Sequence, residues 1–304
     1  MKHVKQNKII LGSLCALGCE TLFGLSYIFT KTATQNASPF ALLGWRFLVA
    51  VVIMSICVAM GLVKVNLKGK SLRPLLLVAL FSPCIYFIGE TIGISHTTAS
   101  ESGVFLACIP VASLIASTLI LKKRPSIMQV VGILITLAGV MLTIFAVGAS
   151  SSLSIVGYLF LFVAVVSYAL YSVFVEKATA YTETEITFVM LVVGAIVFGL
   201  LAVCDAVLNG TVIELIRLPF KENSFAIAVL YQGIGCSILA FFLSNVAIAK
   251  IGVNKTSSFI GVATVVSIIA GALLLKEEFS TYQIVGAIVI IIGVYTANSK
   301  VKNK

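Results

Sequence analysis

The stretch LILKKRPSIMQVVGILITLAGVM, residues 119–141, returns in altered form as LLLKEEFSTYQIVGAIVIIIGVY, residues 273–295. Nine of the 23 aligned positions are identical. They include three polar or glycine pairs: Gln129 with Gln283, Gly132 with Gly286, and Gly139 with Gly293. A shorter match places IFTKTAT (28–34) over VFVEKAT (173–179). The chain is therefore expected to consist of two related halves, 1–148 and 149–304.

The composition is that of an integral membrane protein. Of the 304 residues, 60% are hydrophobic and 11% are charged, whereas an average soluble domain has roughly 25% charged residues. The formal charge of +10 is better explained by basic residues at the ends of membrane spans than by nucleic-acid binding. We expect contact with the lipid bilayer and none with nucleic acid.

Apolar runs near the ~20 residues that cross a bilayer recur along the whole chain. They must be helices, because a backbone in lipid has to satisfy its own hydrogen bonds. We expect ten spans: 9–30, 40–62, 74–94, 100–121, 127–147, 153–175, 186–208, 225–248, 257–275 and 280–297. The first run is long enough to span, so we expect it to remain as a helix rather than to be removed as a signal peptide.

The distribution of basic residues predicts the orientation. Of the 21 Lys and Arg residues, sixteen fall on the side of the two termini, four fall in the opposite loops, and Arg46 lies inside a span. Because basic loops remain in the cytoplasm, both termini are expected there. The localisation expected is a multi-pass protein of the plasma membrane.

Two halves of five spans each must enter the membrane from opposite faces. The predicted fold is thus an all-α membrane protein of two inverted five-helix repeats around a central cavity. Transporters are built in this way, with a binding site at the repeat interface near the bilayer midplane.

Three motifs resemble the EamA-type members of the drug/metabolite transporter superfamily. They are GLSYIFTKTATQNASPFALLGWRFLVA (24–50), ETIGISHTTASESGVFLACIPVASLIASTLILKKRPS (90–126) and the repeated segment at 273–295. The resemblance implies a cavity lined by helices 1 to 4 and 6 to 9, with helices 5 and 10 at the periphery. It also implies transport of small metabolites, often the export of amino acids. In place of an acidic turn, this chain has Lys122, Lys123 and Arg124, and Glu20 is unusual at its position.

Charged residues inside the spans are the first candidates for a site, because an ionised side chain at mid-bilayer costs about 3 kcal/mol or more. Arg46 and Glu90 share a depth, so they could form a structural ion pair or could both line the cavity. Glu20 lies near the middle of the first span without an evident partner. Burial disfavours its charged form, so Glu20, and second Glu90, are candidate proton carriers.

Aromatic and polar residues complete the predicted substrate site. Aromatic residues at helical spacing also occur in ordinary packing, and that alternative stays open. With the charged residues, the predicted site comprises Glu20, Tyr27, Trp45, Arg46, Tyr86, Glu90, Tyr168, Tyr171, Tyr231, Gln232, Ser244 and Asn245. The repeat places Ser244 opposite Glu90. Pro83 and Pro110, near the middles of the third and fourth spans, can kink these helices.

Other classes of protein fit poorly. The seven cysteines show no CxxC or Cys/His spacing, so neither a metal nor another cofactor is expected. With two histidines and no nucleophile beside a base, a membrane-embedded enzyme is a remote alternative without identifiable catalytic residues. A phosphorylated cargo would need several cations in the cavity, and Arg46 is the one basic residue inside the expected spans.

The sequence therefore favours a secondary transporter, working by alternating access, that exports amino acids or similar small metabolites. Proton coupling is an open option. The alternative is a transporter of organic cations, amines or drugs, because carboxylates and aromatic faces bind such cargo. We also expect a small-molecule substrate as a partner. The protein is expected to be either a monomer or a homodimer.

Overall fold

The computed structural model describes residues 2–35, 37–96, 105–146, 154–275 and 280–299. Every regular element in these ranges is a helix. In the first half they are α1 (Lys2–Ala33), α2 (Pro39–Ala59), α3 (Arg73–Ala79), η1 (Leu80–Ile85), α4 (Tyr86–His96), α6 (Ile109–Leu121) and α7 (Ile127–Ala146). In the second half they are α8 (Ile155–Lys177), α9 (Glu183–Leu208), α10 (Val212–Lys221), α11 (Asn223–Leu230), η2 (Tyr231–Ala240), α12 (Phe241–Ile251), α13 (Val253–Ser257), α14 (Gly261–Leu275) and α15 (Thr281–Asn298).

The helices are suited to a membrane. Within the described residues, eight helices are long and apolar enough to cross a bilayer. Two shorter apolar helices, Phe105–Leu121 and Ile127–Thr143, correspond to the fourth and fifth expected spans. The protein is therefore an all-helical, multi-pass membrane protein. Part of the loop expected after the seventh span is helical, because α10 occupies it.

The repeated segment starts in the same way in both halves. Before α7, the Ser126 hydroxyl accepts a hydrogen bond from the Gln129 amide (3.2 Å), and the Gln129 side chain accepts one from the Ser126 amide (2.8 Å). Ser280 and Gln283 form the same reciprocal pair before α15, at 3.2 and 2.9 Å. Each pair satisfies two donors that a helix start leaves open. Helix capping thus accounts for the repeated serine and glutamine.

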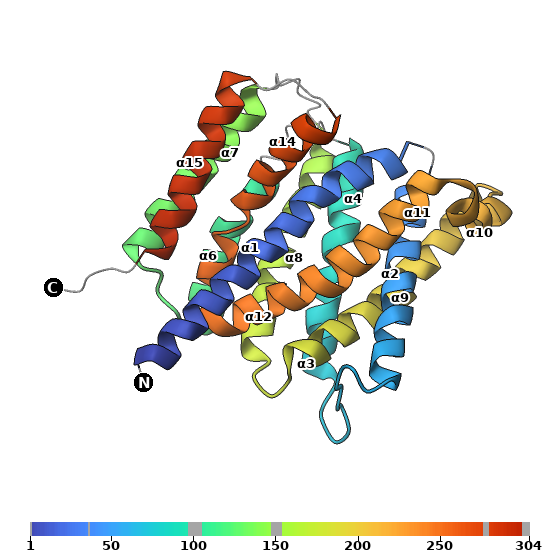
Figure 1. Ribbon diagram of the computed structural model, residues 1–304, viewed down its shortest axis with the longest axis horizontal. Coiled ribbons are helices and arrows are strands. Elements are labelled where there is room, and N and C mark those ends of the chain that lie inside the picture. The colour runs from blue at the N-terminus through green and yellow to red at the C-terminus, as the bar shows by residue number, and fades with distance from the viewer. Residues whose placement is uncertain (1, 36, 97–104, 147–153, 276–279, 300–304) are drawn as a thin grey trace.

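The repeated glycines join α7 to α15. A Cβ atom added at Gly132 would lie 2.6 Å from the carbonyl oxygen of Gly293, and one added at Gly139 would lie 2.8 Å from that of Gly286. The reverse contacts, from Gly293 to Gly132 and from Gly286 to Gly139, are equally close at 2.8 Å. Only glycine allows two helix backbones to approach so closely. Figure 1 shows α7 and α15 side by side at one edge of the bundle.

The remaining helices pack in pairs around the centre (Figure 1). α2 packs on α9, and α8 packs on α4 and α6, much as α1 packs on α12 and α14. The largest apolar cluster includes Phe47, Phe87, Phe198 and Phe241, whose rings meet at centroid distances of 5.1–6.4 Å. Of these rings, those of Phe87 and Phe241 line the region in which the charged side chains lie.

Three of the central helical segments are interrupted. Ser82 has extended backbone angles (φ −143°, ψ 123°) directly before Pro83, which separates α3 from α4. A turn at Cys108 precedes Pro110, which occupies the first turn of α6. The expected kinks at both prolines are therefore present. In the second half, residues 258–260 separate α13 from α14. Such breaks leave backbone polar groups available beside a cavity.

Candidate functional site

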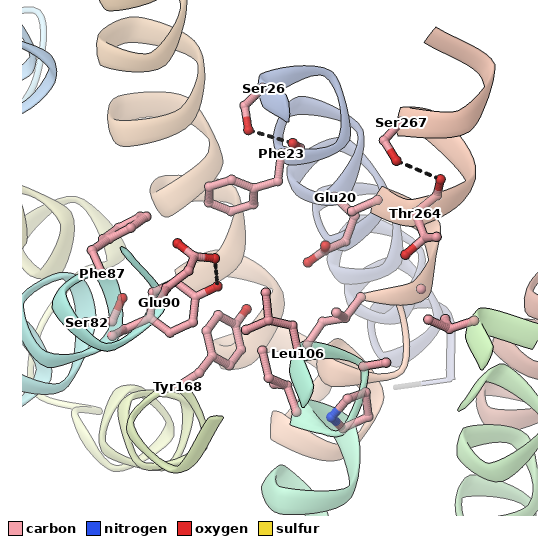
Figure 2. A pocket seen from close by; sticks show the side chains of 18 of the residues that line it. Glu20, Phe23, Ser26, Ser82, Phe87, Glu90, Leu106, Tyr168, Thr264 and Ser267 are labelled. Carbon is pink, nitrogen blue, oxygen red and sulfur yellow. Dashed lines mark hydrogen bonds between the residues drawn. The ribbon is translucent and has the colours of Figure 1, made fainter. Parts of the chain in front are cut away.

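A cavity of about 440 Å³ lies between the broken helices. Its walls come from α1, α2, η1, α4, α6, α7, α8, α12 and α14. The polar side chains that line it are Glu20, Ser26, Thr30, Arg46, Ser82, Tyr86, Glu90, Thr136, Tyr168, Thr264 and Ser267. This volume lies within the roughly 300–1,000 Å³ that is typical of small-molecule sites. Figure 2 shows Glu20 and Glu90 reaching into it from two sides.

The cavity corrects one expectation drawn from the family resemblance. The fifth helix, α7, was expected at the periphery, but Ile133, Thr136, Leu137 and Val140 of α7 line the cavity. None of the described lining residues comes from the seventh span, α9. The reason is geometric: α7 packs on α15 and also contacts α14, whose residues line the cavity, whereas the Phe47 and Phe87 rings lie against Phe198 of α9.

Glu20 is an isolated acid. It is 5% exposed, it lines the cavity, and no ion pair or hydrogen bond joins its side chain to another described residue. Gly24, one turn along α1, lets α1 approach α14 closely, since a Cβ atom there would lie 2.6 Å from the Ala263 carbonyl oxygen. The carboxyl group is thus held in an apolar wall, where its charged form is disfavoured.

Glu90 is hydrogen-bonded to a tyrosine of its own helix. The Tyr86 hydroxyl, one helical turn earlier, donates a 2.8 Å hydrogen bond to Glu90 Oε1 (Figure 2). The Tyr86 ring meets the Tyr168 ring edge to face at a centroid distance of 5.5 Å. Gly89 brings α4 onto α8, where an added Cβ atom would lie 2.8 Å from the Phe160 carbonyl oxygen. This packing fixes the height at which Glu90 faces the cavity.

Arg46 is held by the second half of the chain. It is 5% exposed, and its Nε donates a 2.7 Å hydrogen bond to the Ser237 hydroxyl. Its Nη1 donates a longer bond, 3.4 Å, to Gln232 Oε1, while Gln232 Nε2 donates to the Thr30 hydroxyl at 2.7 Å. The guanidinium carbon lies 4.8 Å from the centroid of the Phe87 ring, which provides a cation–π contact.

The possible ion pair between Arg46 and Glu90 is absent. The ion pairs within the described residues join Lys70 to Glu185, Lys123 to Glu176 and Lys250 to Glu183. Arg46 Nη2 has no hydrogen-bond partner although it is buried. The Ser237 hydroxyl and the Phe87 ring hold the guanidinium in place, so the two groups line one cavity without neutralising each other directly.

Six of the other predicted site residues lie at the cavity or next to it. Tyr86 and Tyr168 line the cavity. Gln232, Tyr171, Ser244 and Asn245 are buried beside it. The Tyr171 hydroxyl donates to Asn245 Oδ1 at 2.8 Å and lies 3.3 Å from the Ser244 hydroxyl, which can donate to it.

Two predicted residues are directed elsewhere. The Trp45 indole donates to the Leu215 carbonyl oxygen, and the Tyr231 hydroxyl donates to that of Leu22, both at 2.9 Å. Neither is among the residues that line the cavity, because these backbone contacts direct the two side chains into helix packing. Tyr27 lies on α1, and its side chain is outside the described part.

Several lining residues were not predicted. Phe23, Ser26 and Thr30 extend along α1, and Ser82, Phe87, Thr264 and Ser267 complete the walls. The Ser26 and Ser267 hydroxyls donate to the carbonyl oxygens of Phe23 and Thr264 in their own helices, at 2.7 and 2.9 Å (Figure 2). The sequence signal available for these residues was the spacing of Ser26 and Thr30 by four and the Ser-Pro pair at Ser82.

The side chains of the cavity can bind a charged small molecule. Two carboxylates, one guanidinium, hydroxyls and aromatic rings can recognise a charged small molecule. Among the described residues, no cluster of three or more His, Cys, Asp or Glu side chains could hold a metal ion.

Known proteins resemble the chain over nearly its whole length. The model of the EamA-like transporter family matches residues 10–145 and 155–299. The uncharacterized transporter YcxC of Bacillus subtilis (strain 168) is 33% identical over 293 residues, covering 96% of this chain and 94% of that protein. The WAT1-related protein At1g44800 of Arabidopsis thaliana is 23% identical over 308 residues, covering 89% of this chain and 80% of that protein.

A solved crystal structure has the same fold, with a TM-score of 0.75, 19% identity, and coverage of 94% of this chain and 97% of that one. The family model thus matches the chain twice, over two ranges that together cover most of it. This chain therefore belongs to the EamA-like transporter family, within the drug/metabolite transporter superfamily.

Proposed function

We propose that this protein is a secondary transporter that exports amino acids or similar small metabolites across the plasma membrane by alternating access. The observation that carries the proposal is the 440 Å³ cavity lined by Glu20, Glu90 and Arg46 in the middle of an apolar helix bundle. Charged side chains in such a place are costly unless they serve a substrate or ion pathway. The family membership supports transport as the activity.

We further propose that the halves 1–148 and 149–304 form ten spans related by a two-fold axis in the membrane plane. The contact of α7 with α15 supports this: Gly132 meets Gly293 while Gly139 meets Gly286. In the repeat alignment these are the same two positions exchanged, as a two-fold axis requires. The packing of α4 and α6 on α8 has a matching counterpart in that of α12 and α14 on α1.

The ion pairs support a conformation closed on the side of the chain termini. Lys70 contacts Glu185 at 2.8 Å, and Lys123 contacts Glu176, so each pair joins the first half to the second. Both pairs lie in or beside loops that the basic-residue count assigns to the cytoplasm. Opening on that side would require these contacts to separate. On the other side, the cavity extends to Thr30 and Ile94, near the C-terminal ends of α1 and α4. This arrangement is what one state of an alternating-access cycle requires.

A second candidate is a transporter of organic cations. Phe23, Phe87, Tyr86 and Tyr168 line the same cavity as the two carboxylates, and aromatic faces with carboxylates bind quaternary or protonated amines. The two candidates differ in whether Arg46 binds the cargo, because an organic cation has no carboxylate for it.

Flux through the purified protein tests the function. We expect sealed vesicles containing the protein to exchange radiolabelled amino acids, with the cargo recovered chemically unchanged. Empty vesicles are the control for leakage. Exchange of a quaternary amine without exchange of any amino acid would favour the second candidate, and chemical conversion of the cargo would reject transport as the activity.

Labelling of introduced cysteines tests the orientation. Lys68 and Asn209 are both exposed in loops, and the basic-residue count places them on opposite sides. An impermeant thiol reagent added to intact cells is expected to label Asn209→Cys and to leave Lys68→Cys unlabelled until the cells are opened. The reverse pattern would place the termini outside.

A further inference from the structure

The charges around the cavity do not balance. Glu20 and Glu90 contribute two carboxylates, and Arg46 is the one basic side chain among the described lining residues. All three sit in an apolar bundle, where an uncompensated charge is costly. With both acids ionised, the cavity therefore has one negative charge in excess.

Within the described residues, no ion pair joins any two of these three groups. Arg46 is fixed by Ser237 and stacked near Phe87, Glu90 is bound by Tyr86, and Glu20 has no polar side-chain partner among the described residues. Figure 2 shows Glu20 and Glu90 on different walls, α1 and α4, with open space between their carboxyl groups. Since no ion-pair contact among the described residues occupies any of the three groups, a bound molecule can meet each of them with an opposite charge.

We propose that the cavity selects dibasic amino acids, molecules with two ammonium groups and one carboxylate. This inference rests on the proposed transport of amino acids and narrows its substrate class. The two ammonium groups pair with Glu20 and Glu90, and the carboxylate pairs with Arg46, whose buried Nη2 has no hydrogen-bond partner. Three charges of the cargo then meet three opposite charges of the cavity, and the net charge becomes zero.

The aromatic lining suits the part of the cargo between its charges. The methylene chain of a dibasic amino acid can lie against Phe23, Phe87 and Tyr168, which line the cavity beside the carboxyl groups. A neutral amino acid of the same length has the same apolar contacts but leaves one carboxylate without a counter-charge. It would bind only with that acid protonated, so it should bind more weakly.

A competition assay compares cargos that differ by one charged group. Protein in sealed vesicles exchanges radiolabelled lysine while unlabelled lysine, ornithine, norleucine or cadaverine competes. Norleucine lacks the second ammonium group and cadaverine lacks the carboxylate. We expect lysine and ornithine to compete at least tenfold more strongly than either of the other two. Equal competition by lysine and norleucine would overturn the proposal, as would competition by cadaverine equal to that by lysine.

Variants then assign the preference to the carboxylates. Glu90→Gln and, separately, Glu20→Gln should reduce the preference for lysine over norleucine by tenfold or more. Glu214→Gln is the matched control, because it removes a carboxylate from the exposed helix α10, and it should leave the preference unchanged. An unchanged preference in both cavity variants would also overturn the proposal.

The assay separates this proposal from the broader one. Exchange of norleucine and other neutral amino acids with no preference for lysine would refute the dibasic selectivity and leave amino-acid transport standing. Absence of exchange for every amino acid, in vesicles where folding is verified by thermal unfolding, would refute both. The wild-type competition decides the question even if a cavity variant does not fold.

Discussion

The repeat is preserved at the contact between α7 and α15 and is lost at the wall of the cavity. At the α7–α15 contact the two halves use the same residues, because glycine meets glycine and each helix starts with the same serine and glutamine pair. At the cavity they differ, since Glu90 of the first half corresponds to Ser244 of the second, and the described carboxylates of the lining both come from the first half. If the proposed two-fold axis relates the halves, the contact across it requires equal partners, whereas a site for an asymmetric small molecule does not.

The largest effect is expected where two backbones touch. Gly139→Ala places a Cβ atom 2.8 Å from the Gly286 carbonyl oxygen, and backbone cannot move aside without separating the helices. We expect a loss of about 1–3 kcal/mol in the free energy of unfolding, as for overpacked cores, measured by thermal unfolding in detergent.

Gly199 provides the matched control for this change, because nothing lies within 4 Å of a Cβ atom there. Gly199→Ala should be neutral or should stabilise α9 by up to about 1 kcal/mol, since alanine is the better helix former. Equal effects at the two glycines would show that close approach is not what holds α7 to α15.

The next effect is expected at Arg46, whose guanidinium group donates hydrogen bonds to Ser237 and Gln232. Arg46→Met should abolish transport and leave Gln232 and Ser237 without their partner, while Ser237→Ala should cost about 1–3 kcal/mol, because Nε then loses its acceptor. A double-mutant cycle of these two residues should be strongly non-additive. The cycle of Arg46→Met with Glu90→Gln should be closer to additive, because the structure contains no direct contact between them. Strong coupling in that second cycle would mean that the two groups pair in another state of the transporter.

A more selective effect is expected at Glu20. Glu20→Gln keeps the shape of the side chain but removes its ability to titrate, and the surrounding wall already disfavours the charged form. The variant should still exchange neutral amino acids between the two sides of a vesicle, yet fail to concentrate them under an imposed pH gradient. Unimpaired accumulation would identify Glu20 as a structural acid and make Glu90 the better candidate for coupling.

The sequence alone predicts more of the fold than of the site. Length, hydropathy and the repeat predict an all-helical membrane protein, and Glu20, Arg46 and Glu90 stand out because charge in an apolar run is rare. The rotation of each helix is a weaker signal. Trp45 and Tyr231 resemble cavity aromatics in the sequence, but backbone carbonyls that accept from their side chains draw them into helix packing. Likewise, no pattern in the sequence indicates that Ser237, 191 residues away, accepts from Arg46.

The smallest effect is expected at the repeated helix caps. It tests whether the two halves are equivalent at positions where their sequences agree. Ser126→Ala and Ser280→Ala each remove the hydroxyl that accepts from the amide of Gln129 or Gln283 at 3.2 Å. Each should cost about 1 kcal/mol, the usual value for a helix N-cap. The costs should be equal within error, because the geometry is the same and both helices start outside the cavity. Ser126→Thr and Ser280→Thr keep an accepting hydroxyl and should restore most of the stability. A cost at one site several times that at the other, measured by thermal unfolding, would mean that the two halves are not equivalent even where their sequences agree.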